Sequence, residues 1–248
     1  MSDTAAGMAG TPGLRSVRAA LSAAAVWVVI EFVVRTAGAV LVLLSLKPSA
    51  WMPGEQVELR FGWNVGLAAL STLMLGAVFY RRIRREDLRW AGLGYRFDAA
   101  VAVSGVASGA VLLGSLLLVG KIDAHLFGLA DADGPAKGIA AAGMPVALAF
   151  LVDNGVVSPA IEEFVWRGCI QRRLIAGWGA RLGIVVTALL FAAKHIVVDL
   201  SLIRTTTLLA ASVGLGVIGY QWGTWASTLA HITMNTSATL YDLIAAWR

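Results

Sequence analysis

The sequence is poor in charge and has almost no cysteine. Of its 248 residues only 14% are charged, whereas 58% are hydrophobic, and the mean hydropathy is +0.76. A soluble domain of this length needs far less apolar material to fill its core. The single cysteine, Cys169, excludes an intramolecular disulfide and a cluster of cysteine metal ligands. Water is therefore not the main solvent of this chain.

The formal charge of +5 does not indicate a nucleic-acid partner. The basic residues stand in short segments between apolar blocks, whereas a nucleic-acid partner would require a soluble basic face. The sequence also shows no internal repeat, low-complexity tract or interdomain linker. The basic residues are better explained as determinants of orientation in a lipid bilayer.

Long apolar blocks fill most of the chain. The first, Ala19 to Leu46, is too long for a cleaved signal core, and others follow at 62–80, 99–120, 139–166, 182–198, 205–220 and 222–246. A helix of about 20 apolar residues crosses the hydrocarbon core of a bilayer. We therefore predict an all-α, polytopic bundle of about seven transmembrane helices. It forms one membrane domain over residues 15–248, after a disordered tail over residues 1–14.

Arginines predict the orientation of this bundle. They crowd the segments after the second and fourth blocks, at Arg81, Arg82, Arg84, Arg85, Arg89 and Arg96 and at Arg167, Arg172, Arg173 and Arg181. Cytoplasmic loops carry an excess of Lys and Arg. Both segments should therefore be cytoplasmic, which also places the N-terminus inside. The expected location is the inner or plasma membrane.

Placing an ionisable side chain in hydrocarbon costs free energy, so each one within an apolar block is a candidate for a functional or pairing role. Glu163 and Arg167 are four residues apart on a predicted helix and can pair. Glu162 points about 100° away and has no partner in its own helix, so we expect it to be the free carboxylate. A poorly hydrated carboxylate is suited to take a proton from water and return it to a leaving amine. A snorkelling interfacial Glu–Arg pair explains these residues equally well at this point.

Two further clusters occupy the fifth and seventh blocks. Phe191 lies one turn before His195, which could orient a water, although a lone intramembrane histidine more often serves helix packing. His231 and Asn235 share one helix face, where fixed donors can stabilise the oxyanion of a tetrahedral intermediate. An interhelical hydrogen bond would use the same pair. Because all these groups fall within residues 162–235, one shared site is favoured over independent packing roles.

Other polar residues have simpler explanations. Glu31 and Arg35, four apart in the first block, are expected to neutralise each other. Asp153 and Asn154 are expected to hydrogen-bond a neighbour in preference to lining a water path. Pro159 predicts either the start of a new helical segment or a kink in the fourth helix.

With these motifs the sequence resembles the CAAX-protease and bacteriocin-processing (CPBP, or Abi) family of intramembrane proteases. The resemblance extends over about residues 140–245. The family motifs EExxxR, FxxxH and HxxxN stand here as Glu162-Glu163 to Arg167, Phe191 to His195, and His231 to Asn235. Three motifs in order with matching spacing are specific, whereas any one alone would be weak.

The resemblance implies an intramembrane endopeptidase that cleaves a membrane-associated protein or peptide. It implies that Glu162 and His195 activate the hydrolytic water and that His231 and Asn235 form the oxyanion hole. Three further residues would support them: Glu163, Arg167 and Phe191.

The family has been described both as metalloproteases and as glutamate-type proteases. Glu162, His195 and His231 could in principle bind Zn²⁺. We expect a glutamate-type enzyme without a cofactor, because one carboxylate base and an Asn beside His231 fit water activation and oxyanion binding without a third strong ligand. The alternative from another class is a non-catalytic scaffold or bacteriocin-immunity protein on the same fold, against which the presence of Glu162 argues.

Overall fold

The computed structural model describes residues 12–45, 55–85, 90–127, 134–199, 202 and 204–248. Over these residues the chain is almost entirely helical and contains no strand, so the predicted all-α bundle is confirmed. Residues 1–11 of the predicted tail lie outside the described part of the chain. The first helix begins at Pro12, slightly before the expected boundary.

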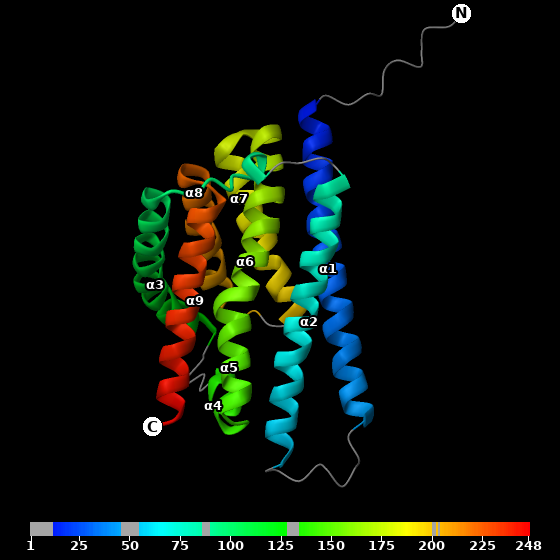
Figure 1. The fold of residues 1–248 in the computed structure, drawn as a ribbon, viewed down its shortest axis with the longest axis vertical. Coiled ribbons are helices and arrows are strands. Elements are labelled where there is room, and N and C mark those ends of the chain that lie inside the picture. Colours follow the sequence, from blue (N-terminus) through cyan, green and yellow to red (C-terminus); the bar gives the residue numbers. More distant parts are fainter. Residues whose placement is uncertain (1–11, 46–54, 86–89, 128–133, 200–201, 203) are drawn as a thin grey trace, which may run out of the picture.

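The helices largely follow the predicted apolar blocks (Figure 1). The first half contains α1 (Pro12–Ser45), α2 (Glu55–Arg85), the short 3-10 helix η3 (Trp90–Leu93), α3 (Ala99–Phe127) and α4 (Gly134–Ala141). A helical stretch then contains α5 (Met144–Val152), the π-helix η4 (Asp153–Val157), α6 (Ser158–Glu163), the π-helix η5 (Phe164–Gln171) and α7 (Arg172–Asp199), which is broken at Gly179. The chain ends with α8 (Thr205–Trp222) and α9 (Thr224–Ala246).

Four stretches of the described chain are long and apolar enough to cross a membrane. They are Arg15–Leu41, Gly62–Arg85, Ala99–Ile122 and Met144–Asp199. The last has 56 residues, far more than one crossing needs, and it bends at Gly179, whose φ of 80° is non-helical. The chain is therefore a multi-pass membrane protein.

Pro159 marks a distortion within a helix and does not start a new one. Proline lacks an N–H, and its ring crowds the carbonyl one turn earlier in an α-helix. Here the π-helix η4 ends directly before Ser158, whose backbone N–H bonds to the carbonyl of Asp153, five residues back. The wider turn accommodates the proline and leaves the helix continuous. Of the two predicted outcomes, the kink within the helix is the one found.

Two groups of helices pack side by side. α1 packs against α2 and α7, and their shared core contains Trp27, Phe79, Trp166 and Phe191. α3 packs against α8 and α9, where Gly105 and Gly109 allow close approach: a Cβ on either glycine would lie under 3.0 Å from a backbone oxygen of α9. The segment α5–α6 lies between these groups (Figure 1). It carries the two adjacent glutamates, whose side chains are 13% and 0% exposed.

Candidate active site

Glu163 lies at the centre of a closed ion network. Its Oε1 atom is 3.0 Å from Arg167 Nη1 and 3.0 Å from His231 Nδ1. The Glu163 and Arg167 side chains are 0% and 1% exposed, so water does not compete for these contacts. Arg167 Nη2 also donates to Ser212 Oγ at 2.9 Å. The predicted pairing of Glu163 with Arg167 is present, and it ties η5 to α8 and α9.

Glu162, one residue earlier, points to a different partner. Lys194 Nζ of α7 donates to Glu162 Oε1 at 2.7 Å, and the Glu162 side chain is 13% exposed. Lys194 is itself buried and also lies 3.5 Å from Glu31 Oε2 of α1. The expectation of a free carboxylate was therefore wrong, because it considered only partners within the helix that carries Glu162.

Lys194 is held by rings as well as by carboxylates. Its Nζ atom lies 5.1 Å from the ring centroid of Phe191 and 5.6 Å from that of Trp27. Cations lying over aromatic faces are attracted by the ring quadrupole. Arg167 lies 4.9 Å from the centroid of Phe191, so the cation beside Glu162 and the cation beside Glu163 both lie near this ring.

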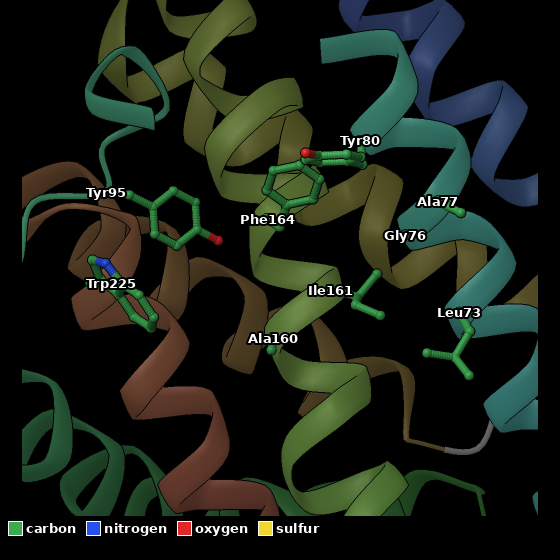
Figure 2. Close-up of a pocket in the computed structure, with 9 residues that line it drawn as sticks. All are labelled: Leu73, Gly76, Ala77, Tyr80, Tyr95, Ala160, Ile161, Phe164 and Trp225. Carbon is green, nitrogen blue, oxygen red and sulfur yellow. The ribbon is translucent and has the colours of Figure 1, made fainter. Parts of the chain in front are cut away.

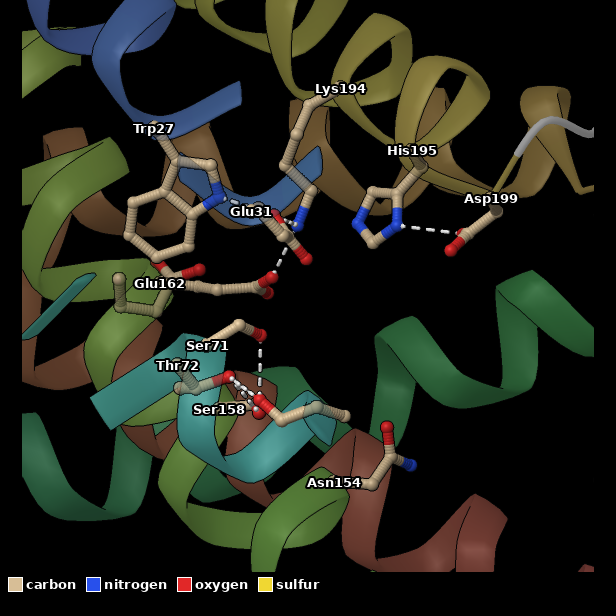
Figure 3. A network of polar contacts seen from close by, with 12 residues as sticks. Trp27, Glu31, Ser71, Thr72, Asn154, Ser158, Glu162, Lys194, His195 and Asp199 are labelled. Carbon is tan, nitrogen blue, oxygen red and sulfur yellow. Dashed lines mark hydrogen bonds and ion pairs between the residues drawn. The ribbon is translucent and has the colours of Figure 1, made fainter. Parts of the chain in front are cut away.

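His195 is on the same helix as Lys194 and bonds to Asp199. The distance from His195 Nδ1 to Asp199 Oδ2 is 3.4 Å, and the ring packs edge-on against Phe191 at 5.0 Å between centroids. A carboxylate only accepts hydrogen bonds, so Nδ1 carries the hydrogen and the neutral ring keeps the lone pair on Nε2. Figure 3 shows the ring between Lys194 and Asp199. Nε2 is thus the ring atom that can accept a hydrogen bond from water.

His231 and Asn235 share a face of α9, as predicted, but bind different elements. His231 reaches Glu163, whereas Asn235 Nδ2 donates to the carbonyl of Asn154 in η4 at 3.0 Å. Thr236 Oγ1 donates to the next carbonyl, that of Gly155, also at 3.0 Å. A π-helix breaks the regular i→i−4 ladder, and these two side chains bond carbonyls in that turn.

Glu162 is the point at which the three motifs meet. Lys194 and His195 of α7 and His231 of α9 all act electrostatically on its carboxylate. Of the four predicted catalytic residues, the structure therefore brings Glu162, His195 and His231 together, while Asn235 lies one helical turn along α9 from His231.

Asp153 and Asn154 hydrogen-bond to neighbours, as expected. Ser158 Oγ donates to Asp153 Oδ1 at 3.3 Å and lies 3.2 Å from Thr72 Oγ1 of α2. Asn154 Nδ2 donates to Thr239 Oγ1 at 2.8 Å. These bonds attach η4 and α6 to α2 on one side and to α9 on the other.

Sequence reasoning assigned no role to Lys194 and underestimated Glu31 and Arg35. Glu31 and Arg35 do approach each other, at 3.8 Å, but Arg35 Nη1 lies closer to Asp199 Oδ1, at 2.9 Å. The signal that could have found Lys194 is its charge: a lysine within an apolar block requires a counter-ion on another helix.

A pocket of about 670 Å³ opens between α2 and α6, beside the segment that carries Glu162. Figure 2 shows its walls of aliphatic and aromatic side chains. Burial raises the pKa of the Tyr95 hydroxyl above its ordinary value, so this group stays neutral. The pocket is lined by Leu73, Gly76, Ala77, Tyr80, Tyr95, Ala160, Ile161, Phe164 and Trp225.

The residues considered for Zn²⁺ do not form a ready metal site. Within the described ranges, no group of three His, Cys, Asp or Glu side chains is arranged to hold a metal ion. The three candidates each have a protein partner: Lys194 for Glu162, Asp199 for His195 and Glu163 for His231. These residues as arranged do not fit a three-ligand zinc centre.

The fold and the site together define a class: a multi-pass α-helical membrane protein with a polar, ionisable centre enclosed between its helices. Residues 144–237 match the family model described as Type II CAAX prenyl endopeptidase Rce1-like. This segment, from α5 into α9, contains all three motifs, so the predicted relationship to the CAAX-protease family is confirmed over it. The match supports an intramembrane endopeptidase activity in general terms. No curated protein and no solved structure matched the chain.

Proposed function

We propose that this chain is a glutamate-type intramembrane endopeptidase in which Glu162 and His195 activate water. The observation that carries the proposal is the convergence on Glu162. Lys194, His195 and His231 come from two other helices, and all act on this one carboxylate. A carboxylate retained inside a membrane bundle with such neighbours is a functional-site candidate.

In the proposed reaction the carboxylate acts first as base and then as acid. Lys194 occupies Glu162 Oε1, and Oε2 takes a proton from a water that His195 Nε2 orients. The water oxygen bonds to the peptide carbonyl carbon and forms a tetrahedral intermediate. The C–N bond then breaks, the amine nitrogen takes the proton from Glu162, and the carboxylate is restored. The products are a new carboxyl terminus and a new amino terminus.

His231 and Asn235 are proposed to stabilise the intermediate's oxyanion. The Asn235 amide has two hydrogens, and the carbonyl of Asn154 accepts one, so the second can serve the oxyanion. His231 directs Nδ1 to the Glu163 carboxylate, so it can donate through Nε2 only as the imidazolium. Glu163 holds the His231 ring in place, and Arg167 holds Glu163.

The proposed substrate is a protein or peptide associated with the bilayer. Candidates by family resemblance are the C-terminal tails of lipidated proteins, bacteriocin or other secreted-peptide precursors, and the C-terminal sorting signals of surface proteins. We propose that the N-terminus faces the cytoplasm, as the arginines after the second and fourth apolar blocks favour.

The test compares the terminal peptides of the membrane proteome in cells that carry wild type, Glu162→Gln or Asp98→Asn. Asp98 caps the start of α3 by accepting from the backbone N–H of Val101, and asparagine can retain that cap. The Asp98→Asn variant therefore controls for loss of a carboxylate outside the site. Immunoblots establish that all three proteins accumulate equally.

The proposal expects a cleaved terminus that is present with wild type and with Asp98→Asn and absent with Glu162→Gln. Terminal peptides that are unchanged by Glu162→Gln, in cells where a deletion has a phenotype that the variant complements, would establish the non-catalytic scaffold instead. A chelator added to isolated membranes separates the two catalytic types. Loss of cleavage that Zn²⁺ restores would overturn the glutamate-type mechanism.

A further inference from the structure

We infer that Glu31 of α1 is a positioning residue for the site, although α1 lies outside the segment that matches the family model. This inference rests on the proposed function and deepens it. Glu31 touches neither Glu162 nor His195. It lies at the junction of two chains of ionic contacts, one leading to each of them. Figure 3 shows the first, from Glu31 through Lys194 to Glu162.

The first chain joins Glu31 to Glu162 through Lys194. Lys194 Nζ lies between the two carboxylates, 3.5 Å from Glu31 Oε2 and 2.7 Å from Glu162 Oε1. Trp27 Nε1 donates to the same Glu31 oxygen at 2.6 Å, which fixes the carboxylate from one turn earlier on α1. Lys194 is 1% exposed, so its ammonium depends on these carboxylates for compensation.

The second chain joins Glu31 to His195 through Arg35 and Asp199. Arg35 Nη1 is 3.8 Å from Glu31 Oε1 and 2.9 Å from Asp199 Oδ1. The other oxygen of Asp199 holds His195 Nδ1 and thereby sets which ring nitrogen remains an acceptor. The described contacts of Glu31 thus influence both the base and the histidine that orients water.

Glu31 acts through its negative charge, because it is one of the carboxylates that surround Lys194 and Arg35. Lys194 and Arg35 are cations, whereas Glu31, Glu162 and Asp199 are carboxylates, so each cation lies between two carboxylates. If Glu31 becomes neutral, Lys194 has only Glu162 as a close counter-ion and binds it more tightly. A carboxylate held more tightly by an ammonium is a weaker proton acceptor. Arg35 likewise loses one carboxylate and turns further toward Asp199.

The test uses Glu31→Gln with two reference variants. Glutamine keeps an oxygen for Trp27 but has no charge. Ser16→Ala is the matched control, because Ser16 Oγ also joins α1 to α7, by a bond of 3.0 Å to the carbonyl of Arg173, but far from the ion network along α1. Glu162→Gln reports whether the chain cleaves through Glu162 at all.

Two readouts are measured on protein in lipid nanodiscs. The first is cleavage of a synthetic peptide that spans the Glu162-dependent site found by terminal-peptide comparison. The second is the ¹⁵N NMR spectrum of histidine-labelled protein, in which His231 serves as internal reference because its described ring contact is with Glu163. We expect Glu31→Gln to lower kcat by about 10- to 100-fold while KM changes by no more than about twofold.

We also expect Glu31→Gln to move the ring signals of His195 and to leave those of His231 in place. Ser16→Ala should change neither kcat nor either histidine. A kcat for Glu31→Gln within about twofold of wild type, with Glu162→Gln inactive, would overturn this inference and leave the proposed function standing. If Glu162→Gln still cleaves, the proposed function fails, and the histidine spectrum alone decides the inference.

Arg35→Gln keeps the test decisive if Glu31→Gln does not accumulate. The Arg35 and Asp199 side chains are 38% and 41% exposed, so this end of the network tolerates substitution. The inference then expects the His195 signals to shift with Arg35→Gln and not with Ser16→Ala. Unmoved His195 signals would overturn it.

Discussion

Glu162 and Glu163 are neighbours in sequence, yet they belong to two different electrostatic environments. Glu163 is fully buried between Arg167 and His231, so its contacts join α6 to η5 and α9, and Arg167 extends them to Ser212 of α8. Glu162 is partly exposed and bonds to one lysine, which a second carboxylate on α1 shares. The first environment is fully buried, whereas the second is partly exposed and shares its lysine with another helix.

This difference shows how two adjacent residues of one helix can have different roles. Adjacent side chains diverge by about 100° around a helix axis, enough to reach different neighbours. Phe191 contacts both environments, because Arg167 and Lys194 both lie near its ring. Glu163 therefore belongs to a fully buried ion pair, and Glu162 is the carboxylate that we propose to react.

The largest expected effect comes from Glu162→Gln. Loss of a general base lowers turnover by about 10²- to 10⁴-fold. The glutamine oxygen can still accept from Lys194, and Glu31 remains as its counter-ion, so we expect the thermal unfolding midpoint to stay close to that of wild type. Peptide cleavage and unfolding in nanodiscs measure the two quantities. An inactive variant that is also strongly destabilised would contradict the separation of the two environments.

Glu163→Gln should affect stability first. It leaves the guanidinium of Arg167, which is 1% exposed, without its counter-ion, and breaking a buried pair in this way costs about 3–5 kcal/mol. We expect a clear fall of the unfolding midpoint and poor accumulation in membranes. Adding Arg167→Met should recover part of the midpoint, because the unpaired charge is removed as well. An unchanged midpoint in the single variant would show that the pair does not stabilise the fold.

The sequence predicts much of this arrangement because much of it is local. Apolar blocks locate the helices, and i,i+4 spacing correctly pairs Glu163 with Arg167. The break between the predicted blocks 205–220 and 222–246 is found at Gly223, whose φ of 91° suits glycine. The matched spacing of the three motifs correctly indicates that they belong to one family.

The partner of Glu162 could not be predicted in the same way. Lys194 is 32 positions away, and its contact with Glu162 depends on how α6 is rotated relative to α7. The π-helices η4 and η5 lie on either side of α6 and change that rotation. The burial of Lys194 requires a counter-ion, but only the three-dimensional structure identifies that counter-ion as Glu162.

Asn235→Ala tests a smaller contribution on the Glu162 side. Loss of one oxyanion donor costs about 10²- to 10³-fold in kcat. The change also removes the bond to the carbonyl of Asn154, so a modest fall of the unfolding midpoint should accompany it. Turnover of the cleavable peptide, measured at saturating concentration, checks the catalytic part. A kcat like that of wild type would remove Asn235 from the proposed oxyanion hole.

Thr236→Val is the matched change one residue further along α9 and should have the smallest effect. Thr236 donates to the carbonyl of Gly155 over the same distance at which Asn235 donates to that of Asn154. Valine keeps the shape of threonine, so only the hydrogen bond is lost, at about 0.5–1.5 kcal/mol. If Asn235 acts only by bracing η4, both variants should lower the midpoint and kcat alike. If Asn235 donates to the oxyanion, Asn235→Ala should lower kcat, whereas Thr236→Val should leave kcat at the wild-type value. Both substitutions remove a hydrogen bond to the same turn of η4, but only Asn235→Ala also removes a donor from the site.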